Sequence, residues 1–487
     1  MSILTRRDFL KDSALFAAAA AAFGPQPSAA EEPRPVRKVG ANDRIRVACI
    51  GFNGQGKTHL NSFASLPDTQ VVMICDVDKS LADMGIKIVE DRQKSRPEFV
   101  QDLRRIMDRK EIDVVSIATP NHWHALAAIW AIQAGKDVYV EKPVSHNVWE
   151  GRRIVDFARR HKKIVQTGTQ SRSNEGMRQT LDFIHAGKIG KVTLARGLCY
   201  KPRGSIGPKV TAKPPASVDY NLWLGPAPEK PVTRQRFHYD WHWFWDYGNG
   251  DLGNQGIHEM DKARWGLKKS TLCQAVLSFG GRFGYEDAGE TANTQVCLFD
   301  YGDCQLIFEV RGLKTGDLLG AKVGNIWYGT EGYVVSSNYH SGAAFTPKGE
   351  LIQKFDGGGN HYANFIKAVK SRTPADLTAD IEEGHLSSAL CHLGNISYRL
   401  GTVELLDPRS DRAPLESRLQ LDKEGAETLT RTLEHLKDNG IKLEGLGLRI
   451  GKRLKFDPQA ERFVDSDEAN KLLTREYRKG FEVPAKG

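Results

Sequence analysis

The sequence predicts an α/β protein with an N-terminal doubly wound parallel sheet and a C-terminal α+β domain built on an open, mostly antiparallel sheet. Between residues 44 and 140, short apolar runs alternate with helical stretches, a pattern typical of a parallel sheet with helices on both faces. A glycine-rich loop follows the first run. Beyond about residue 190, apolar runs succeed one another with little helix between them, and Asp300-Tyr301-Gly302-Asp303 predicts a hairpin turn.

Each element is bounded by its own local signals. In the first domain, turn and helix-end residues separate strands predicted at 44–50, 71–75, 113–118 and 137–140, with helices up to residue 66 and over 124–133. In the second, strands are expected at 191–200, 273–279, 294–299 and 304–310, and helices at 361–369 and 380–399. Asp380 and Glu383 resemble a capping box at the start of the last helix.

These elements divide the 487-residue chain into five segments. Residues 1–30 form a secretion signal and 31–43 a Pro-, Lys- and Arg-rich linker. The parallel-sheet domain covers 44–167, and the substrate and oligomerisation domain covers 168–405. Residues 406–487 are highly charged and are expected to form a C-terminal extension that wraps the body.

The N-terminus carries the pattern of a twin-arginine secretion signal. Arg6-Arg7 precedes an alanine-rich apolar run at 13–23, and Ser28-Ala29-Ala30 offers a small-residue cleavage site. The run is too short for a stable membrane span. The pattern predicts export by the twin-arginine translocation machinery to the periplasm or beyond; the alternative is a cytoplasmic chain with a basic amphipathic start.

Composition narrows the classes of partner. The net charge is +9, but basic and acidic residues are interleaved without a basic block, so no nucleic-acid partner is expected and an anionic sugar stays open. The seven cysteines are odd in number and lack ligand spacing, which indicates buried free thiols and no metal site.

The glycine loop fits two phosphate-binding patterns. Gly51, Gly56, Lys57 and Thr58 satisfy GxxxxGK[ST], the P-loop pattern. The same loop approximates the dinucleotide fingerprint GxGxxG, with Asn53 at the middle glycine. Asp76 closes the second strand about twenty residues later, where an acid accepts both adenosine ribose hydroxyls and repels a 2′-phosphate. The combination favours a dinucleotide over a P-loop, and NAD over NADP.

Three further motifs carry a family resemblance. They are Ala118-Thr119-Pro120-Asn121-His122-Trp123-His124, Glu141-Lys142-Pro143, and the segment 250–261, which reads GDLGNQGIHEMD. In this order they resemble the Gfo/Idh/MocA family (glucose–fructose oxidoreductase, inositol dehydrogenase and rhizopine catabolism proteins), over roughly residues 42–400. The ending 475–481 looks like that of secreted members. The resemblance implies a Rossmann domain, a second domain on an open sheet, and a nicotinamide between them.

The resemblance also assigns roles by position. The phosphate loop would consist of Gly51, Asn53, Gly54, Gln55 and Gly56, with Asp76 at the adenosine ribose. The nicotinamide ribose would be lined by Thr119, Pro120, Asn121, His124 and Glu141. Lys142 would face the substrate hydroxyl. His258 would be its acid/base partner, with an ordinary pKa of about 6.5 that suits proton exchange at neutral pH.

One position departs from the family pattern. Many family dehydrogenases carry Asp four residues before the histidine, and here that residue is Asn254. Four residues apart is one helix face, so Asn254 is still expected at the site, where it can hydrogen-bond but cannot ionise. Asp251 and Asp261 are candidate replacements for the missing carboxylate.

An aromatic segment at 237–247 runs directly into the histidine motif. Its two interpretations are a packed core or oligomer contact, and a sugar platform on which rings cover C–H faces. The candidate substrate residues are Tyr239, Trp241, Trp243 and Arg172. An open sheet face commonly forms the family's oligomer interface, so a homo-oligomer is compatible with the sequence.

The leading functional hypothesis is an NAD-dependent oxidoreductase that acts on a CH–OH group of a sugar or polyol. A second hypothesis is a glycoside hydrolase or lyase that oxidises a sugar carbon transiently with bound NAD, eliminates the glycosidic bond and restores the cofactor. Export favours this second activity, because free NAD is not expected outside the cytoplasm. The third is a non-catalytic NAD-binding scaffold, which would need neither Lys142 nor His258.

Overall fold

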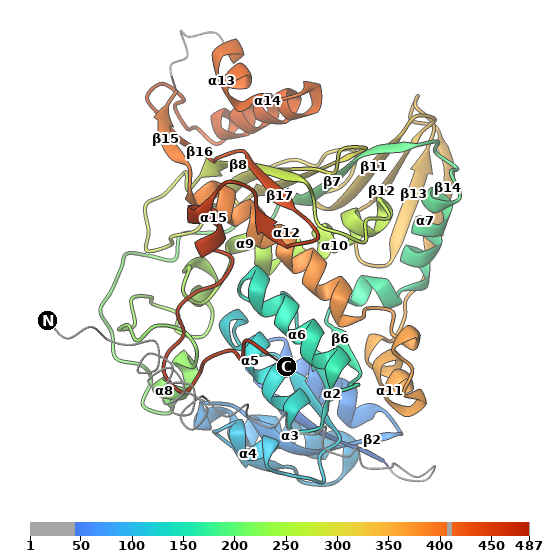
Figure 1. Ribbon diagram of the computed structural model, residues 1–487, viewed down its shortest axis with the longest axis vertical. Helices are drawn as coiled ribbons and strands as arrows, with labels where there is room; N and C mark the ends of the chain where they lie inside the picture. The colour runs from blue at the N-terminus through green and yellow to red at the C-terminus, as the bar shows by residue number, and fades with distance from the viewer. Residues whose placement is uncertain (1–43, 407–411, 487) are drawn as a thin grey trace, which may run out of the picture. The chain divides into compact units, whose positions relative to one another are not determined.

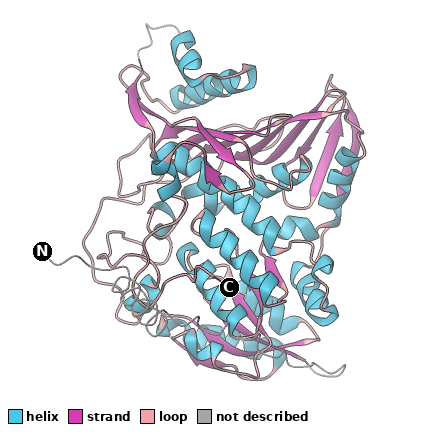
Figure 2. Ribbon diagram, viewed as in Figure 1, coloured by secondary structure: helices cyan, strands magenta, loops and turns pink. Residues whose placement is uncertain are grey.

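The computed structural model describes residues 44–406 and 412–486. The secretion signal and linker predicted at 1–43 lie outside these residues, as does the short segment 407–411. Within the described part, no helix is both long and apolar enough to cross a membrane. The strands form two separate sheets, seen in magenta in Figure 2.

The first sheet has six parallel strands in the order β3-β2-β1-β4-β5-β6. Its strands are β1 (Ile45–Ile50), β2 (Thr69–Cys75), β3 (Glu98–Val100), β4 (Val114–Ile117), β5 (Asp137–Val140) and β6 (Val165–Thr167). Its helices are α2 (Gly56–Ser65), α3 (Ala82–Gln93), α4 (Arg104–Met107), α5 (Asn121–Gln133) and α6 (Val148–Arg160). Strand order reverses between β1 and β4, which opens a crevice at the carboxyl ends of the strands.

The buried strand residues explain why this sheet forms. Every residue of β4 and β5 is buried, as expected for a parallel sheet covered on both faces. Helix α5 is almost entirely buried as well, between the sheet and the C-terminal tail residue Phe481. The helix begins at Asn121, three residues before the predicted start, so Asn121 and His124 both lie in its first turns at the crevice.

The second sheet has twelve strands and is mostly antiparallel; β10 and β7 form a parallel pair. Its path runs β14-β13-β12-β11-β7-β10-β9-β8-β16-β15; off this path, β17 pairs with β8 and β18 pairs with β17. The strands are β7 (Val192–Cys199), β8 (Ala275–Gly281), β9 (Thr294–Asp300), β10 (Gln305–Arg311), β11 (Val323–Gly329), β12 (Tyr333–Ser336), β13 (Ser341–Phe345), β14 (Leu351–Asp356), β15 (Thr402–Leu405), β16 (Gly447–Ile450), β17 (Leu454–Asp457) and β18 (Arg462–Phe463). The predicted fold class is therefore confirmed for both sheets.

One face of this sheet packs against α10 (Gly256–Gly266) and α12 (Ile381–Arg399), which are labelled in Figure 1. Met260 and Leu393 from these helices share a core with Phe308 and Trp327 of the strands. Asp380 caps α12, as expected, by accepting the Glu382 amide. The predicted capping role of Glu383 is wrong, because its carboxylate pairs with Arg172 and Arg264 instead.

The other face is covered by the C-terminal extension. Leucines of α13 (Arg412–Leu419) and α14 (Lys423–Asp438) pack on Phe279, Leu298 and Ile307 of β8 to β10. A buried carboxylate, Glu309 of β10, fastens α14 further: both oxygens receive the Arg431 guanidinium, at 2.7 and 2.9 Å. The extension thus joins the body through a hydrophobic layer and a buried ion network.

Removal of the Glu309 carboxylate should weaken the contact between the extension and the sheet. Burial alone would raise the pKa of Glu309, but Arg431, Arg311 and Arg196 hold it at about 2. In Glu309→Gln these guanidinium groups lose their buried carboxylate, and we expect a loss of about 3–5 kcal/mol in the free energy of unfolding, measured by urea denaturation near neutral pH. The loss relative to wild type should shrink as the pH falls from about 5 toward 2, because the wild-type carboxylate then becomes protonated.

Glu427→Gln is the matched control. Glu427 also contacts Arg431 and Arg196, but its side chain is 48% exposed. Loss of the Glu427 charge should lower the free energy of unfolding by no more than about 1 kcal/mol. Equal losses in the two variants would show that burial of the Glu309 charge contributes nothing.

Candidate active site

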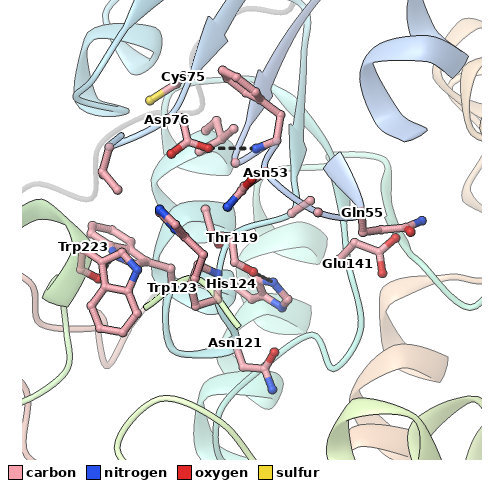
Figure 3. Close-up of a pocket in the computed structure, with 18 of the residues that line it drawn as sticks. Asn53, Gln55, Cys75, Asp76, Thr119, Asn121, Trp123, His124, Glu141 and Trp223 are labelled. Atoms are coloured by element: carbon pink, nitrogen blue, oxygen red, sulfur yellow. Dashed lines mark hydrogen bonds between the residues drawn. The ribbon is translucent and has the colours of Figure 1, made fainter. Parts of the chain in front are cut away.

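A cavity of about 310 Å³ lies at the carboxyl ends of the parallel strands (Figure 3). Loops after β1, β2, β4 and β5 form one wall. The opposite wall comes from the loop at 222–242 and from Asn254. The cavity thus collects the predicted motif residues from separate parts of the sequence, at the place where doubly wound sheets bind ligands.

The glycine loop enters the cavity between β1 and α2. Gly51 has φ +77°, and a Cβ there would lie 2.8 Å from the Ala118 carbonyl oxygen; at Gly56 a Cβ would lie 1.9 Å from the Gly51 oxygen. Both positions therefore require glycine. A Cβ on Gly54 would meet nothing within 4 Å, which leaves that side of the loop open. Gly51 to Gln55 line the cavity, and Gly56 begins α2 behind them.

This geometry decides between the two phosphate-loop patterns. Lys57 and Thr58, which a P-loop would turn toward its phosphates, are exposed on the first turn of α2 and lie outside the cavity lining. Asp76, by contrast, lines the cavity next to the loop (Figure 3). The arrangement matches a dinucleotide site better than a P-loop.

The Asp76 carboxylate is held in place by backbone amides. Phe52 N donates to Oδ2 and Asp78 N donates to Oδ1, each at 3.0 Å. Burial raises the pKa of Asp76, while these two hydrogen bonds oppose the rise. Asp78, two residues on, contacts His238 of the opposite wall at 2.9 Å. Strand β2 and the aromatic segment therefore meet at this end of the cavity.

The Thr119–His124 loop lies at the middle of the cavity. The His124 ring spans two backbone carbonyls, with Nδ1 2.6 Å from Pro143 O and Nε2 2.7 Å from Thr119 O. It therefore fixes the loops after β4 and β5 against each other. Asn121 Nδ2 donates to Asn249 Oδ1 at 3.2 Å. Thr119 Oγ1 is buried and has no partner among the described residues, which fits a site that a ligand's polar group completes.

Glu141 is a buried carboxylate with a dedicated partner. His59 Nε2 lies 3.1 Å from its Oε1, and His59 Nδ1 lies 2.6 Å from Ser116 Oγ. Burial opposes ionisation, but the His59 contact and nearby positive charges keep the pKa of Glu141 below its usual value. A Cβ on Gly168 would lie 2.7 Å from Oε1, so this glycine makes room for the carboxylate. His59, Ser116 and Gly168 were missed from sequence because they lie outside the motifs.

Lys142 projects from the end of β5 to the second domain. Its Nζ donates to the backbone carbonyl of Asn254 at 2.8 Å. Burial lowers the pKa of Lys142, opposed by Glu141 and Glu259. The carbonyl is free to accept because α9 (Gly250–Asn254) ends there and the His258 amide bonds to Gln255 O. Asn254 is therefore at the site, as expected, and its main chain is the group that contacts Lys142.

His258 lies deeper than expected. It is 5% exposed and its ring packs on Tyr339, with centroids 4.8 Å apart. Burial, together with Lys142, Lys262, Lys201 and His361, lowers its pKa well below the ordinary value. The expectation of an ordinary pKa near 6.5 is therefore wrong, because desolvation and neighbouring cations keep the ring neutral.

The four candidate substrate residues separate into two groups. Tyr239 and Trp241 line the cavity. Trp243 is buried, with the Arg203 guanidinium 5.3 Å from its ring centre. Arg172 lies outside the cavity lining in a buried ion network with Asp261 and Glu383, at 2.8 and 2.9 Å. The structure therefore gives the last two packing and charge-pairing partners, and their substrate role gains no support from their positions.

The candidate replacements for the missing carboxylate are also engaged elsewhere. Asp251 pairs with Arg203 and Asp261 with Arg172. The cavity has several lining residues that sequence reasoning did not assign: Cys75, Val77 and Gln101 to Arg104. Residues 101–104 follow β3, a three-residue strand too short to show as a periodic pattern.

All seven cysteines are free, and six are buried. No group of three or more His, Cys, Asp or Glu in the described part of the chain could hold a metal ion.

Comparison with known proteins agrees with the two-sheet architecture. Residues 45–169 match the Gfo/Idh/MocA model described as an oxidoreductase family with an NAD-binding Rossmann fold, and residues 204–431 match the model of that family's C-terminal alpha/beta domain. The chain belongs to the Gfo/Idh/MocA family. Both domains of that family, the NAD-binding Rossmann fold and the C-terminal alpha/beta domain, are thus present.

Curated relatives carry the names of different activities. A glycosyl hydrolase family 109 protein of Shewanella pealeana is 30% identical over 202 residues, 39% of this chain and 44% of that protein. The chain thus aligns with less than half of that relative's length. An inositol 2-dehydrogenase/D-chiro-inositol 3-dehydrogenase of Lacticaseibacillus casei is 23% identical over 277 residues, 53% of this chain and 74% of that protein.

Solved structures agree in fold. The WlbA dehydrogenase of Bordetella pertussis, in complex with NADH and UDP-GlcNAcA, superposes with a TM-score of 0.53 at 19% identity, over 72% of this chain and 96% of that one. GenD2 from gentamicin A biosynthesis, in complex with NAD, gives 0.53 at 17% identity, over 74% and 95%. At these identities the similarity shows the fold alone.

The depressed pKa of His258 can be measured directly. We expect its ring to stay neutral well below the ordinary midpoint of about pH 6.5. Lys142→Met should raise the His258 pKa, because it removes one of the nearby positive charges that disfavour the imidazolium. Histidine NMR titrations, with the signal assigned through His258→Gln, measure both. A wild-type midpoint at or above about 6.5 would contradict the burial argument.

Proposed function

We propose that this protein is an NAD-dependent oxidoreductase that oxidises a CH–OH group of a sugar, sugar derivative or polyol. One observation carries the proposal. The cavity has Asp76 and the glycine loop at one end and Lys142, a lysine with a lowered pKa, at the other. Such a cavity matches a dinucleotide with its reactive end beside a proton-accepting group.

The residues present fit the cofactor. The open side of Gly54, the carboxylate of Asp76 and the unpartnered hydroxyl of Thr119 are complementary to phosphate, ribose and amide groups in turn. Bound NAD would supply the hydride acceptor. The ionised Glu141 and the first turn of α5 would orient its nicotinamide end.

Lys142 is the group best placed to move the substrate's proton. A lowered pKa increases the share of neutral amine near neutral pH, and the neutral amine can accept a hydroxyl proton. The hydroxyl oxygen would lose its proton to Nζ while the carbon loses hydride, so an alcohol becomes a carbonyl. Neutral His258 can then serve as a hydrogen-bond partner without competing as a second cation.

A second activity has independent support. Relatives named glycosyl hydrolase family 109 protein and alpha-N-acetylgalactosaminidase match this chain. In a redox-neutral reaction, the carbonyl formed in the first step would acidify the neighbouring C–H, and loss of that proton would expel the glycosidic alcohol and leave a carbon–carbon double bond. Water would then add to the double bond, and the hydride would return from the reduced cofactor to the carbonyl carbon. Both activities share the first step and therefore the same role for Lys142. The Arg6-Arg7 pattern, outside the described residues, supports the further proposal that the protein is exported folded with NAD bound.

Lys142→Ala tests the proposal. Loss of one proton-transfer group should lower turnover by about 10²–10⁴-fold, while NAD binding stays close to wild type. The assay follows NADH formation and glycoside cleavage in parallel, without and with added NAD. Product without net NADH indicates the redox-neutral activity, and NADH formation indicates a dehydrogenase. Near-wild-type rates for Lys142→Ala in both assays would reject the assignment.

Asp76 should set the preference for NAD over NADP. The extra 2′-phosphate would lie beside a buried carboxylate, and we expect NADP to bind more weakly by about 1–3 kcal/mol. Asp76→Ala should reduce the difference between the two cofactors. Fluorescence titration with NADH and NADPH measures it, and Asp102→Ala, at the rim of the same cavity, is the control. Equal binding of both cofactors by the wild type would contradict this role.

A further inference from the structure

Two lysine side chains donate to consecutive residues beside the proposed reaction centre. Lys142 Nζ donates to the Asn254 carbonyl at 2.8 Å, and Lys201 Nζ donates to Gln255 Oε1 at 3.0 Å. Gln255 in turn donates from Nε2 to the Tyr339 hydroxyl at 2.8 Å, and Tyr339 packs on His258. Lys201 therefore belongs to the surroundings of the reaction centre, although no sequence motif contains it.

The carboxylates near these lysines are already committed. Glu141 contacts His59, and Asp251 receives both the Nε and Nη2 of Arg203, at 2.9 and 2.7 Å. Glu259 is fully buried next to Lys262, and burial raises its pKa. In the described chain no carboxylate lies within ion-pair distance of Lys142 or Lys201. Their charge is therefore not compensated by direct contact.

Neighbouring groups respond to this positive charge. Both lysines contribute to lowering the pKa of His258, and Lys201 also contributes to lowering that of Lys142. Lys201 is only partly buried, directly after β7, and it lies outside the residues that line the cavity. A partly buried ammonium whose hydrogen-bond partner is a neutral amide is suited to bind an oxyanion.

We propose that the substrate is a sugar carrying an anionic group, a carboxylate, sulfate or phosphate, and that Lys201 binds this group. The inference rests on the proposed function, since it names the substrate class of the same site. The oxyanion would accept hydrogen bonds from Lys201 Nζ while the hydroxyl to be oxidised lies at Lys142. Lys201 is thus a specificity-determining residue, and Gln255 positions it.

Two variants remove the charge in different ways. Lys201→Gln deletes the ammonium. Gln255→Glu leaves it in place but supplies a carboxylate of nearly the same shape, which neutralises Lys201 within the protein. Lys209→Gln makes the same charge change at an exposed position of the loop that follows Lys201, and serves as the matched control.

The experiment measures binding to the NAD-loaded full chain by calorimetry, with matched sugars in gluco and galacto configuration: the neutral sugar, its uronate, its 6-sulfate and its 6-phosphate. We expect at least one anionic sugar to bind about 10- to 100-fold more tightly than its neutral counterpart, the value of a charge-assisted hydrogen bond. The preference for the anionic sugar should weaken as the salt concentration rises. The anionic sugar that binds most tightly identifies the oxyanion. Lys201→Gln and Gln255→Glu should abolish it, and Lys209→Gln should retain it.

The outcomes separate this inference from the proposed function. If no anionic sugar binds more tightly than its neutral counterpart, or if Lys201→Gln keeps the preference, the inference is overturned. Neither result bears on the role of Lys142, which the turnover assay of Lys142→Ala tests separately. Conversely, a preference that disappears in Lys201→Gln supports the inference even if Lys142→Ala retains its rate, because binding alone is measured.

Discussion

The hydrogen bond from Lys142 Nζ to the Asn254 carbonyl is the contact on which the site depends, because it joins the two domains at the point where the cavity ends. Each domain positions one of the two groups that form this hydrogen bond. Strand β5 brings Lys142 to the carboxyl edge of the parallel sheet, and the interruption between α9 and α10 at Gln255 frees the carbonyl that receives it. Neither domain alone holds both groups. The reaction centre therefore exists only when the two domains are packed together.

Several other buried charges are paired by direct contact. Glu141 has His59, Arg172 has Asp261 and Glu383, and Glu309 has three guanidinium groups. Such pairing is expected, because an unpaired charge in the interior is costly. Among the described residues, Lys142 and Lys201 have no carboxylate within ion-pair distance, and the same holds for the buried cations Lys163 and Arg234, which donate to backbone carbonyls. Of these four, Lys142 lines the cavity, where a ligand can meet it.

The sequence predicted what periodicity and motif spacing can encode. The strands before Gly51, Asp76 and Lys142 are long apolar runs with clear ends, so these residues were placed at the right edge of the right sheet. Short strands were missed: β3 and β6 have three residues each and carry no readable period. The substrate roles predicted for Arg172 and Trp243 gain no support from the structure, for another reason. Their partners, Asp261, Glu383 and Arg203, are distant in sequence, and only the fold shows that these side chains are already engaged.

The replacement of the family's aspartate by Asn254 gains a physical meaning from this geometry. A carboxylate at position 254 would add a negative charge beside Lys142 and raise its pKa, which would keep the ammonium protonated. The neutral carbonyl of Asn254 holds Nζ in place without this effect, while burial and the nearby Lys201 lower the Lys142 pKa. The same cations also lower the pKa of His258. The charges around the site are therefore consistent with the proposed proton-accepting role of Lys142, because they lower the pKa of its amine without placing a carboxylate against it.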